Sequence, residues 1–101
     1  YPRVIEEVLA ACEGVREAAV VGEPHALHGE IPVAYVSLRD GAALGAEHLR
    51  AWCRDSLGRH EIPRRFVILP ELPKNAAGKI LKRALRKQGE VERGVAGEAQ
   101  G

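Results

Sequence analysis

The first apolar pattern of the chain has the spacing of an amphipathic helix. Its apolar face carries Val4, Ile5, Val8, Leu9 and Cys12. Its polar face carries Arg3, Glu6, Glu7 and Glu13. Pro2 suits the first helical turn, and Gly14 is typical of the position just after a helix. We therefore predict that the chain opens with a helix that buries one side.

A second pattern of this kind covers residues 47–57. Its apolar positions are Leu49, Trp52, Cys53 and Leu57. Glu47 lies near the expected start, where the helix dipole favours an acidic residue, and Gly58 marks the end. The pattern predicts a second helix and places Cys53, like Cys12, on an apolar face. We interpret both cysteines as buried small hydrophobic residues rather than as a disulfide or a metal pair.

Three stretches have strand character. Residues 15–21 alternate and then become apolar, residues 31–38 form a second apolar run, and residues 66–69 form a short one. The segment between the first two, residues 22–30, contains glycine, proline and histidine and predicts a long loop.

The last third of the chain changes in composition. Residues 70–78 contain two prolines, a glycine and small residues, so we expect an exposed, mobile loop. A short helix over residues 80–87 should follow. Residues 89–101 hold only two valines among glycine, alanine and polar residues, and we expect a disordered tail.

The order αββαβα predicts an α+β domain in which a small sheet of about three core strands is flanked by three helices. The chain has 101 residues, of which 46% are hydrophobic and 29% charged, which suits one small globular domain. We assign this domain to residues 1–88 and the tail to residues 89–101. No apolar run approaches the roughly 20 residues that cross a bilayer, so we expect no membrane span. The cysteine pattern favours a reducing, cytoplasmic setting.

The net charge of +1 hides an uneven distribution. Residues 1–70 contain eight arginines and ten acidic residues, whereas residues 71–87 contain six basic residues against Glu71 alone. The predicted last helix carries Lys82, Arg83, Arg86 and Lys87. These charges leave open a nonenzymatic module that binds nucleic acid or another acidic surface, or simply a solvated helix face. Because no aromatic residues lie nearby for base stacking, we expect no nucleic-acid partner.

Lys79 is the best candidate for chemistry. It follows Gly78 at the end of the predicted loop and directly precedes the predicted helix, whose free N–H groups and dipole favour an anion. There it can contact a phosphate or a carboxylate, although a solvated charge is the plainer alternative. The segment is not a phosphate-binding P-loop, because Pro73 and Ile80 occupy positions that require glycine and serine or threonine.

His25 and His28 have a spacing that also suits metal ligands. No third or fourth ligand stands near them in the sequence, so we expect no metal site.

Five stretches then form a recognisable series along the chain. They are Tyr1-Pro2 with Ile5 to Leu9, Val15 to Gly29, Ala34-Tyr35-Val36, Ile62-Pro63-Arg64, and Pro73 to Arg83. In this order they resemble the C-terminal domain of the AMP-forming acyl-CoA synthetases, the acyl-adenylate-forming, luciferase-like superfamily. The resemblance covers residues 1 to about 88.

The resemblance implies a function for the loop. Enzymes of this superfamily join a carboxylic acid to ATP and pass the acyl group to CoA, with release of diphosphate and AMP. A large N-terminal AMP-binding domain holds most of the site for ATP, Mg²⁺ and the acid, and the C-terminal domain is a swivelling lid. The resemblance implies that Lys79, beside Gly78, enters this site for adenylation, where its charge offsets that of two anions.

The resemblance also implies that a second face of the lid meets CoA. By position it places CoA contacts at His28, Arg54 and His60, for which ordinary exposed side chains are the alternative. Glu61 departs from the family pattern, which has a lysine there, and its charge would repel a CoA phosphate.

Two further expectations concern the whole protein. A carrier-protein thiol is the alternative acceptor to CoA, although the ending Gly78 to Arg83 favours the CoA ligases. Tyr1 falls inside the signature that joins hinge and helix, so we expect a piece that lacks its N-terminal domain and is inactive alone. The resemblance places the acid pocket in the N-terminal domain, so we expect that domain to select the carboxylic acid.

Overall fold

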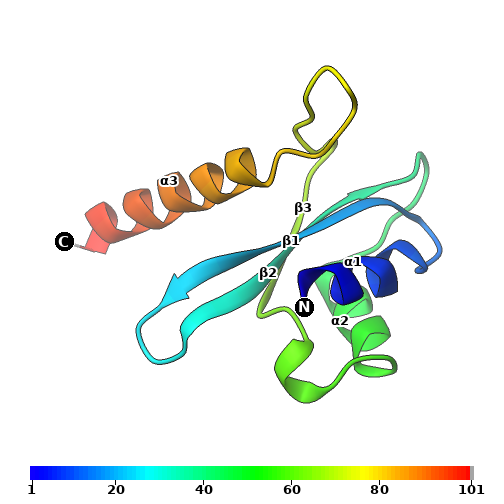
Figure 1. Cartoon of the computed structure of the whole chain (residues 1–101), viewed down its shortest axis with the longest axis horizontal. Coiled ribbons are helices and arrows are strands. Elements are labelled where there is room, and N and C mark those ends of the chain that lie inside the picture. The colour runs from blue at the N-terminus through cyan, green and yellow to red at the C-terminus, as the bar shows by residue number, and fades with distance from the viewer. Residues whose placement is uncertain (101) are drawn as a thin grey trace.

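The computed structural model describes residues 1–100 and the side chains of residues 1–92. The described elements are α1 (Pro2–Ala10), β1 (Val15–His25), β2 (Gly29–Leu38), α2 (Ala46–Arg54), the 3₁₀ turn η1 (Arg59–Glu61), β3 (Arg65–Ile68) and α3 (Lys82–Gln100). This order confirms the predicted αββαβα arrangement. Figure 1 shows α1 and α2 together on one side of the sheet and α3 on the other.

β2 is the central strand of the described sheet, whose order is β1-β2-β3. β1 and β2 are antiparallel, whereas β3 runs parallel to β2. A parallel neighbour requires a crossover connection, and α2 with η1 provides it.

The predicted long loop over residues 22–30 is wrong. β1 continues to His25 and β2 begins at Gly29, so the two strands form one long hairpin. The Nδ1 atom of His25 accepts hydrogen bonds from the backbone N–H groups of Leu27 and His28, at 3.2 and 3.3 Å. Glycine and proline weaken a strand locally, but here hydrogen bonds to the partner strand hold the backbone extended. A local sequence pattern does not reveal such pairing with another strand.

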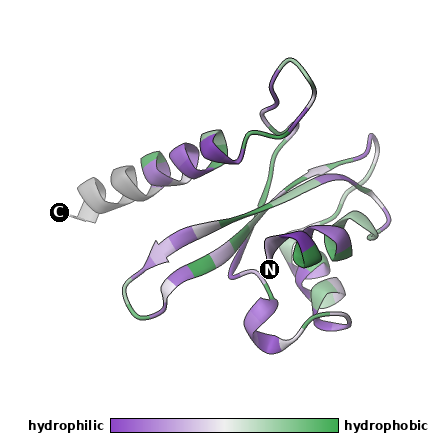
Figure 2. Cartoon of the chain, viewed as in Figure 1, coloured by the Kyte–Doolittle hydropathy of each residue, from purple (hydrophilic) through white to green (hydrophobic). Residues whose placement is uncertain are grey.

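Alternation along the strands divides the core between the two faces of the sheet. Under α1 and α2 the buried residues are Ile5, Leu9, Cys12, Val15, Val20, Ala34, Val36, Leu49, Cys53 and Phe66. Under α3 they are Ala19, Val21, Val33, Tyr35, Leu72 and Leu85. Figure 2 shows apolar residues along the middle of the strands and polar residues on η1 and the first turns of α3. Both cysteines are free and buried, which confirms their interpretation.

Two side chains connect the helices to their surroundings. The indole N–H of Trp52 donates to the carbonyl oxygen of Val8 at 2.7 Å and joins α2 to α1. The Glu6 carboxylate accepts the N–H of Val20 at 2.8 Å and forms an ion pair with Lys82 at 2.7 Å. Glu6 therefore connects α1 and α3 and also provides an acceptor for a backbone N–H of the edge strand β1.

α3 differs from the predicted helix over residues 80–87. It begins at Lys82 and continues to Gln100, so the stretch predicted as a disordered tail, residues 89–101, is helical as far as Gln100. Glutamate, arginine, alanine and glutamine favour a helix in this stretch and outweigh its glycines. Gly101 and the side chains of residues 93–100 lie outside the described part, and a domain boundary at residue 88 stays a prediction.

The described side chains beyond residue 88 contact the rest of the domain. Glu92 accepts a hydrogen bond from Gln88 at 3.3 Å and lies 4.0 Å from Arg65 of β3. In the part of the chain that the structure describes, no helix combines the length and the apolar content needed to cross a membrane.

Candidate functional site

Part of the predicted exposed loop is fixed to the sheet. Lys74 and Ile80 form an antiparallel bridge, and the N–H of Leu81 donates to the carbonyl oxygen of Pro73 at 2.8 Å. Leu72 is 1% exposed and belongs to the core beneath α3. We call residues 72–81 the lysine loop: its base is buried or bonded, and its tip, residues 75–79, is exposed.

The tip has an internal frame of hydrogen bonds. Oδ1 of Asn75 accepts the N–H groups of Ala77 and Lys79, both at 3.0 Å. The N–H of Asn75 donates to the carbonyl oxygen of Lys79 at 2.9 Å. Gly78 has a φ of 84°, a conformation that side-chain-bearing residues rarely adopt. Asn75 and Gly78 therefore supply the turn chemistry that holds the backbone of Lys79 in one place.

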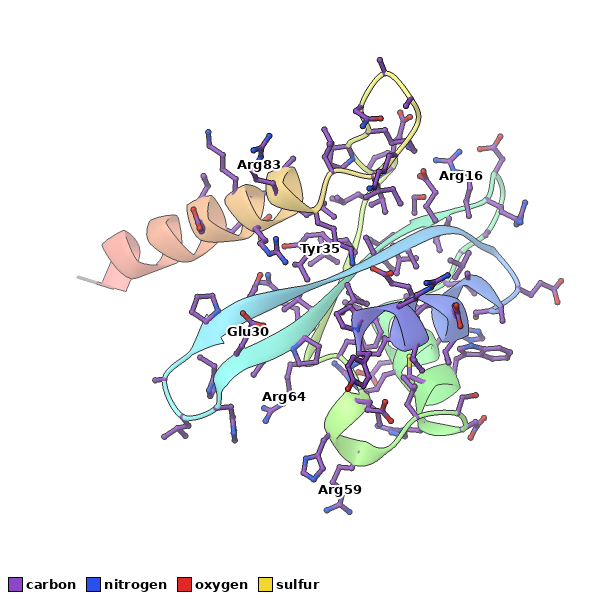
Figure 3. All side chains as sticks on the ribbon, in the orientation of Figure 1. Arg16, Glu30, Tyr35, Arg59, Arg64 and Arg83 are labelled. Carbon is purple, nitrogen blue, oxygen red and sulfur yellow. The ribbon has the colours of Figure 1, made fainter. Side chains whose placement is uncertain are left out.

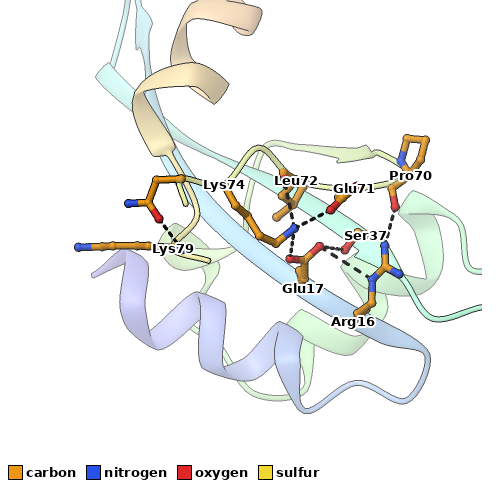
Figure 4. Close-up of polar contacts among 9 residues, drawn as sticks. Arg16, Glu17, Ser37, Pro70, Glu71, Leu72, Lys74 and Lys79 are labelled. Atoms are coloured by element: carbon orange, nitrogen blue, oxygen red, sulfur yellow. Dashed lines mark hydrogen bonds and ion pairs between the residues drawn. The ribbon is translucent and has the colours of Figure 1, made fainter. Parts of the chain in front are cut away.

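Lys79 itself is exposed at this tip, and no ion pair found among the described residues includes it. Figure 4 shows its side chain extending away from the polar cluster around Glu17. With Lys82 and Arg83 it lines an open hollow of about 590 Å³, and Figure 3 shows Arg83 at the start of α3. Because α3 begins at Lys82 rather than directly after Lys79, we assign the positive charge of the hollow mainly to these side chains.

Lys74 has the opposite surroundings. Its Nζ atom lies 2.6 Å from the Glu17 carboxylate and 3.4 Å from that of Glu71, and it donates to the carbonyl oxygen of Leu72 at 3.0 Å. The hydrogen bond with Glu17 is the main reason why the pKa of Lys74 is raised above 10.5. This lysine is held in place as part of the base of the loop.

Glu17 is held as firmly as the lysine that it binds. The Oγ–H of Ser37 donates to its carboxylate at 2.7 Å, and Ser37 is fully buried on the central strand. Burial by itself would raise the pKa of Glu17. Hydrogen bonds from Lys74, Ser37 and the backbone of Leu72 outweigh burial, so the pKa of Glu17 lies below 4.5.

A second cationic surface lies between the β1–β2 hairpin and η1. His28 and His60 both line a groove of about 520 Å³ there, together with Arg59 and Arg64. Figure 3 shows the positions of these two arginines, on η1 and just before β3. The groove thus brings together two of the three predicted CoA contacts. Arg54, exposed in the last turn of α2, is not among the residues that line it.

Sequence reasoning missed Arg59 and Arg64 as parts of this surface. Both stand within four residues of His60, and Arg64 ends the stretch Ile62-Pro63-Arg64, but residues 1–70 contain eight arginines and nothing in the sequence places these two in one groove. Only the position of η1 beside the hairpin does so.

The structure also shows the surroundings of His25, His28 and Glu61, which the sequence analysis discussed. The rings of His25 and His28 stack with centroids 4.8 Å apart, but Nδ1 of His25 is engaged by the turn. Among the described residues, no group of three or more histidine, cysteine, aspartate or glutamate side chains can hold a metal ion. Glu61, the departure from the family pattern, accepts the N–H of Gly58 at 3.1 Å and so has a local role in η1.

Comparison with known proteins gives a consistent result. The family model of the AMP-binding enzyme C-terminal domain matches residues 4–79. The chain is 40% identical over 87 residues to a 2-succinylbenzoate–CoA ligase of Geobacillus kaustophilus, covering 86% of this chain and 18% of the relative. It is 45% identical over 86 residues to a 4-chlorobenzoate–CoA ligase of Pseudomonas sp. (strain CBS-3), covering 84% of this chain and 16% of the relative.

The solved structures agree. The amide bond synthetase McbA from Marinactinospora thermotolerans matches with a TM-score of 0.81 and 43% identity, over 87% of this chain and 18% of that one. The chain therefore spans less than one fifth of the length of each of these three relatives.

Proposed function

Because the chain belongs to the family of AMP-binding enzyme C-terminal domains, we propose that it is the lid of an AMP-forming acyl-CoA synthetase. In this role it works with a large N-terminal domain that holds the pockets for ATP and the carboxylic acid. The described residues offer no cluster of ligands for Mg²⁺. In this proposal Mg²⁺ binds to the N-terminal domain.

Lys79 acts in the first half-reaction. An oxygen of the carboxylate attacks the α-phosphorus of ATP, the bond from this phosphorus to the diphosphate breaks, and acyl-adenylate and diphosphate result. The two reacting groups are both negative, so an ammonium group placed between them lowers the barrier. In the second half-reaction the CoA thiol attacks the acyl carbon, and AMP leaves.

The observation that carries this proposal is the presentation of Lys79. Its backbone is held by Asn75, yet its side chain is exposed and engaged in none of the ion pairs among the described residues. An ammonium group already bound to a carboxylate would have to break that bond to reach a substrate. The loop thus carries a charge that is ready to enter a site on another domain and to leave it.

The groove between the hairpin and η1 serves the second half-reaction. Arg59 and Arg64 supply positive charge for the phosphates of CoA, and His28 and His60 supply flat rings near them. Glu30 also lines this groove and sets a limit on how closely a phosphate approaches its side of the hairpin. Arg54 contributes only if CoA extends beyond the groove toward α2.

The test uses the complete enzyme that contains this chain, with Lys79→Ala. Adenylate formation, followed as diphosphate release, should fall by on the order of 10³-fold, the size expected when a charge-stabilising group is lost. Thioester formation from supplied acyl-adenylate should stay within about twofold. Lys87→Ala, which removes another exposed lysine, is the control and should leave both rates unchanged. Equal losses in both half-reactions with Lys79→Ala would contradict the assignment.

The acceptor is tested separately. A carrier-protein thiol is not favoured over CoA, since both curated relatives described above are CoA ligases. The match to an amide bond synthetase adds an amine as a third acceptor to test. Mass spectrometry of products formed with CoA, a loaded carrier protein or an amine distinguishes the three. The cytoplasmic setting stays a prediction.

A further inference from the structure

We propose that Glu17 is a positioning residue for Lys79 and that it acts through Lys74. The proposal rests on the proposed function of Lys79 and adds a residue that lies on another element of the fold. Glu17 stands on β1, 62 positions before Lys79 in the sequence.

The ion pair between Glu17 and Lys74 is the tightest contact of the lysine loop with the sheet. Its atoms are 2.6 Å apart, and the two side chains are only 15% and 25% exposed. By contrast, the pair between Arg3 and Glu7 on α1 is 3.6 Å apart and 89% and 70% exposed. Shielding from water strengthens the first pair, whereas a pair like the second contributes little.

A β-bulge directs Glu17 toward the loop. The pairing of β1 with β2 shifts register between Val15 and Glu17. Val15 packs in the core under α1 and α2, whereas Ala19 and Val21, which share the face of Glu17, pack in the core under α3 that includes Leu72. Without the extra residue, Val15 and Glu17 would lie on the same face. The bulge therefore allows one strand to serve the core on one side and the loop on the other.

The base of the loop is connected to Lys79 by backbone bonds. Lys74 is bridged to Ile80, and the next residue, Asn75, bonds the backbone of Lys79 through its N–H, at 2.9 Å, and its Oδ1, at 3.0 Å. The exposed tip has no core contact of its own in the described clusters. The direction in which Lys79 points is therefore set at the base, where Glu17 holds Lys74.

The experiment measures both half-reactions of the complete enzyme with Glu17→Gln, Lys74→Gln and the double variant. Each single change should lower kcat for adenylate formation by about ten- to hundredfold, the range expected when a reacting group is misplaced by about 1 Å. The KM values for ATP and the acid should change by less than about twofold, because their pockets lie on the other domain. Thioester formation from supplied acyl-adenylate should be unchanged. Lys74→Gln alone decides the matter if Glu17→Gln does not fold.

Two further measurements separate positioning from folding. If Glu17 acts through Lys74, the double variant should be no slower than the slower single variant. Hydrogen exchange of peptides covering residues 72–81 should be faster in Glu17→Gln, with the rest of the domain unchanged. Glu47→Gln, which breaks an exposed pair with Arg50 on α2, is the control and should change neither half-reaction.

The outcomes distinguish this proposal from the proposed function. If Lys79→Ala stops adenylation while Glu17→Gln and Lys74→Gln leave it unchanged, the positioning role is wrong and the function of Lys79 stands. Additive losses in the double variant, or equal losses in both half-reactions, would also overturn the positioning role. If Lys79→Ala itself spares adenylation, the proposed function fails and the positioning role fails with it.

Discussion

Lys74 and Lys79 stand five residues apart on one loop and have opposite surroundings. Lys74 is partly buried and bound to Glu17, Glu71 and a carbonyl oxygen, whereas Lys79 is exposed and points away from this cluster. The same side chain therefore serves as an anchor at one position and as a free charge at the other. The comparison teaches that the surroundings of a lysine, and not its type, decide whether its charge is bound or free.

The largest effect is expected from removal of the apolar base on which both lysines depend. Leu72 is 1% exposed beneath α3, and Leu72→Ala leaves a cavity there. We expect the free energy of unfolding to fall by about 2–5 kcal/mol, as for other buried leucines. Urea unfolding of the chain measures it. Ile68→Ala, at a 37% exposed position on β3, is the control and should cost clearly less.

A smaller effect is expected at the anchor, and it depends on pH. Glu17→Gln removes one partner of a charged hydrogen bond and should lower the free energy of unfolding by about 1–2 kcal/mol at neutral pH. The pKa of Glu17 is lowered from 4.5, so its contribution is complete above that value and is lost as the pH falls through the lower pKa of the folded state. The difference between the original chain and Glu17→Gln should therefore shrink below pH 4.5.

The same ion pair should also lose its contribution at high pH, through Lys74. The pKa of Lys74 is raised from 10.5, so the contribution of the pair is present below that value and is lost as the pH rises through the higher pKa of the folded state.

At the exposed tip, Lys79→Ala should change the free energy of unfolding by less than about 0.5 kcal/mol, as is usual for an exposed site. A loss as large as that of Glu17→Gln would show that the two lysines do not differ as proposed.

An effect between those of Glu17→Gln and Lys79→Ala is expected from the backbone of the tip. Gly78 has a φ of 84° with open space where a Cβ would lie, so Gly78→Ala introduces conformational strain and no clash. We expect the free energy of unfolding, measured by thermal unfolding, to fall by about 1 kcal/mol, and adenylation by the complete enzyme to be slower.

Gly41 offers a matched control for this change. It has a φ of 83° and equally open space, but it lies in the turn after β2. Gly41→Ala should cost about the same stability and leave adenylation unchanged. Equal effects of both variants on adenylation would show that the tip conformation has no special role.

The fold could be predicted where local spacing decides the structure. Ile5, Leu9 and Cys12 recur with the spacing of a helix because one side of α1 faces the core, although Val4, on the same predicted face, is 43% exposed. The two strands of the hairpin are longer than predicted, because residues 22–30 contain weak strand formers that only pairing with the partner strand holds extended. The last helix extends beyond its predicted end, because its composition favours a helix although its apolar content is low.

The candidate site shows the same division. Gly78 and Lys79 were predicted as site residues from a glycine–lysine pair in a loop and from a resemblance that covers nearly the whole chain. The structure places Lys79 exposed at the tip, and its role stays a proposal. Arg59 and Arg64 were not identified, because their common groove with His28 exists only when η1 lies beside the hairpin.

The sequence by itself determined the amphipathic helices, the burial of both cysteines and the loop that presents Lys79. These features depend on spacing and turn chemistry within a few residues. Only the tertiary structure decided which lysine is bound and which is free. Glu17 meets Lys74 and Ser37 across 57 and 20 positions of the chain, and the strength of such contacts depends on distance and burial, which packing alone sets.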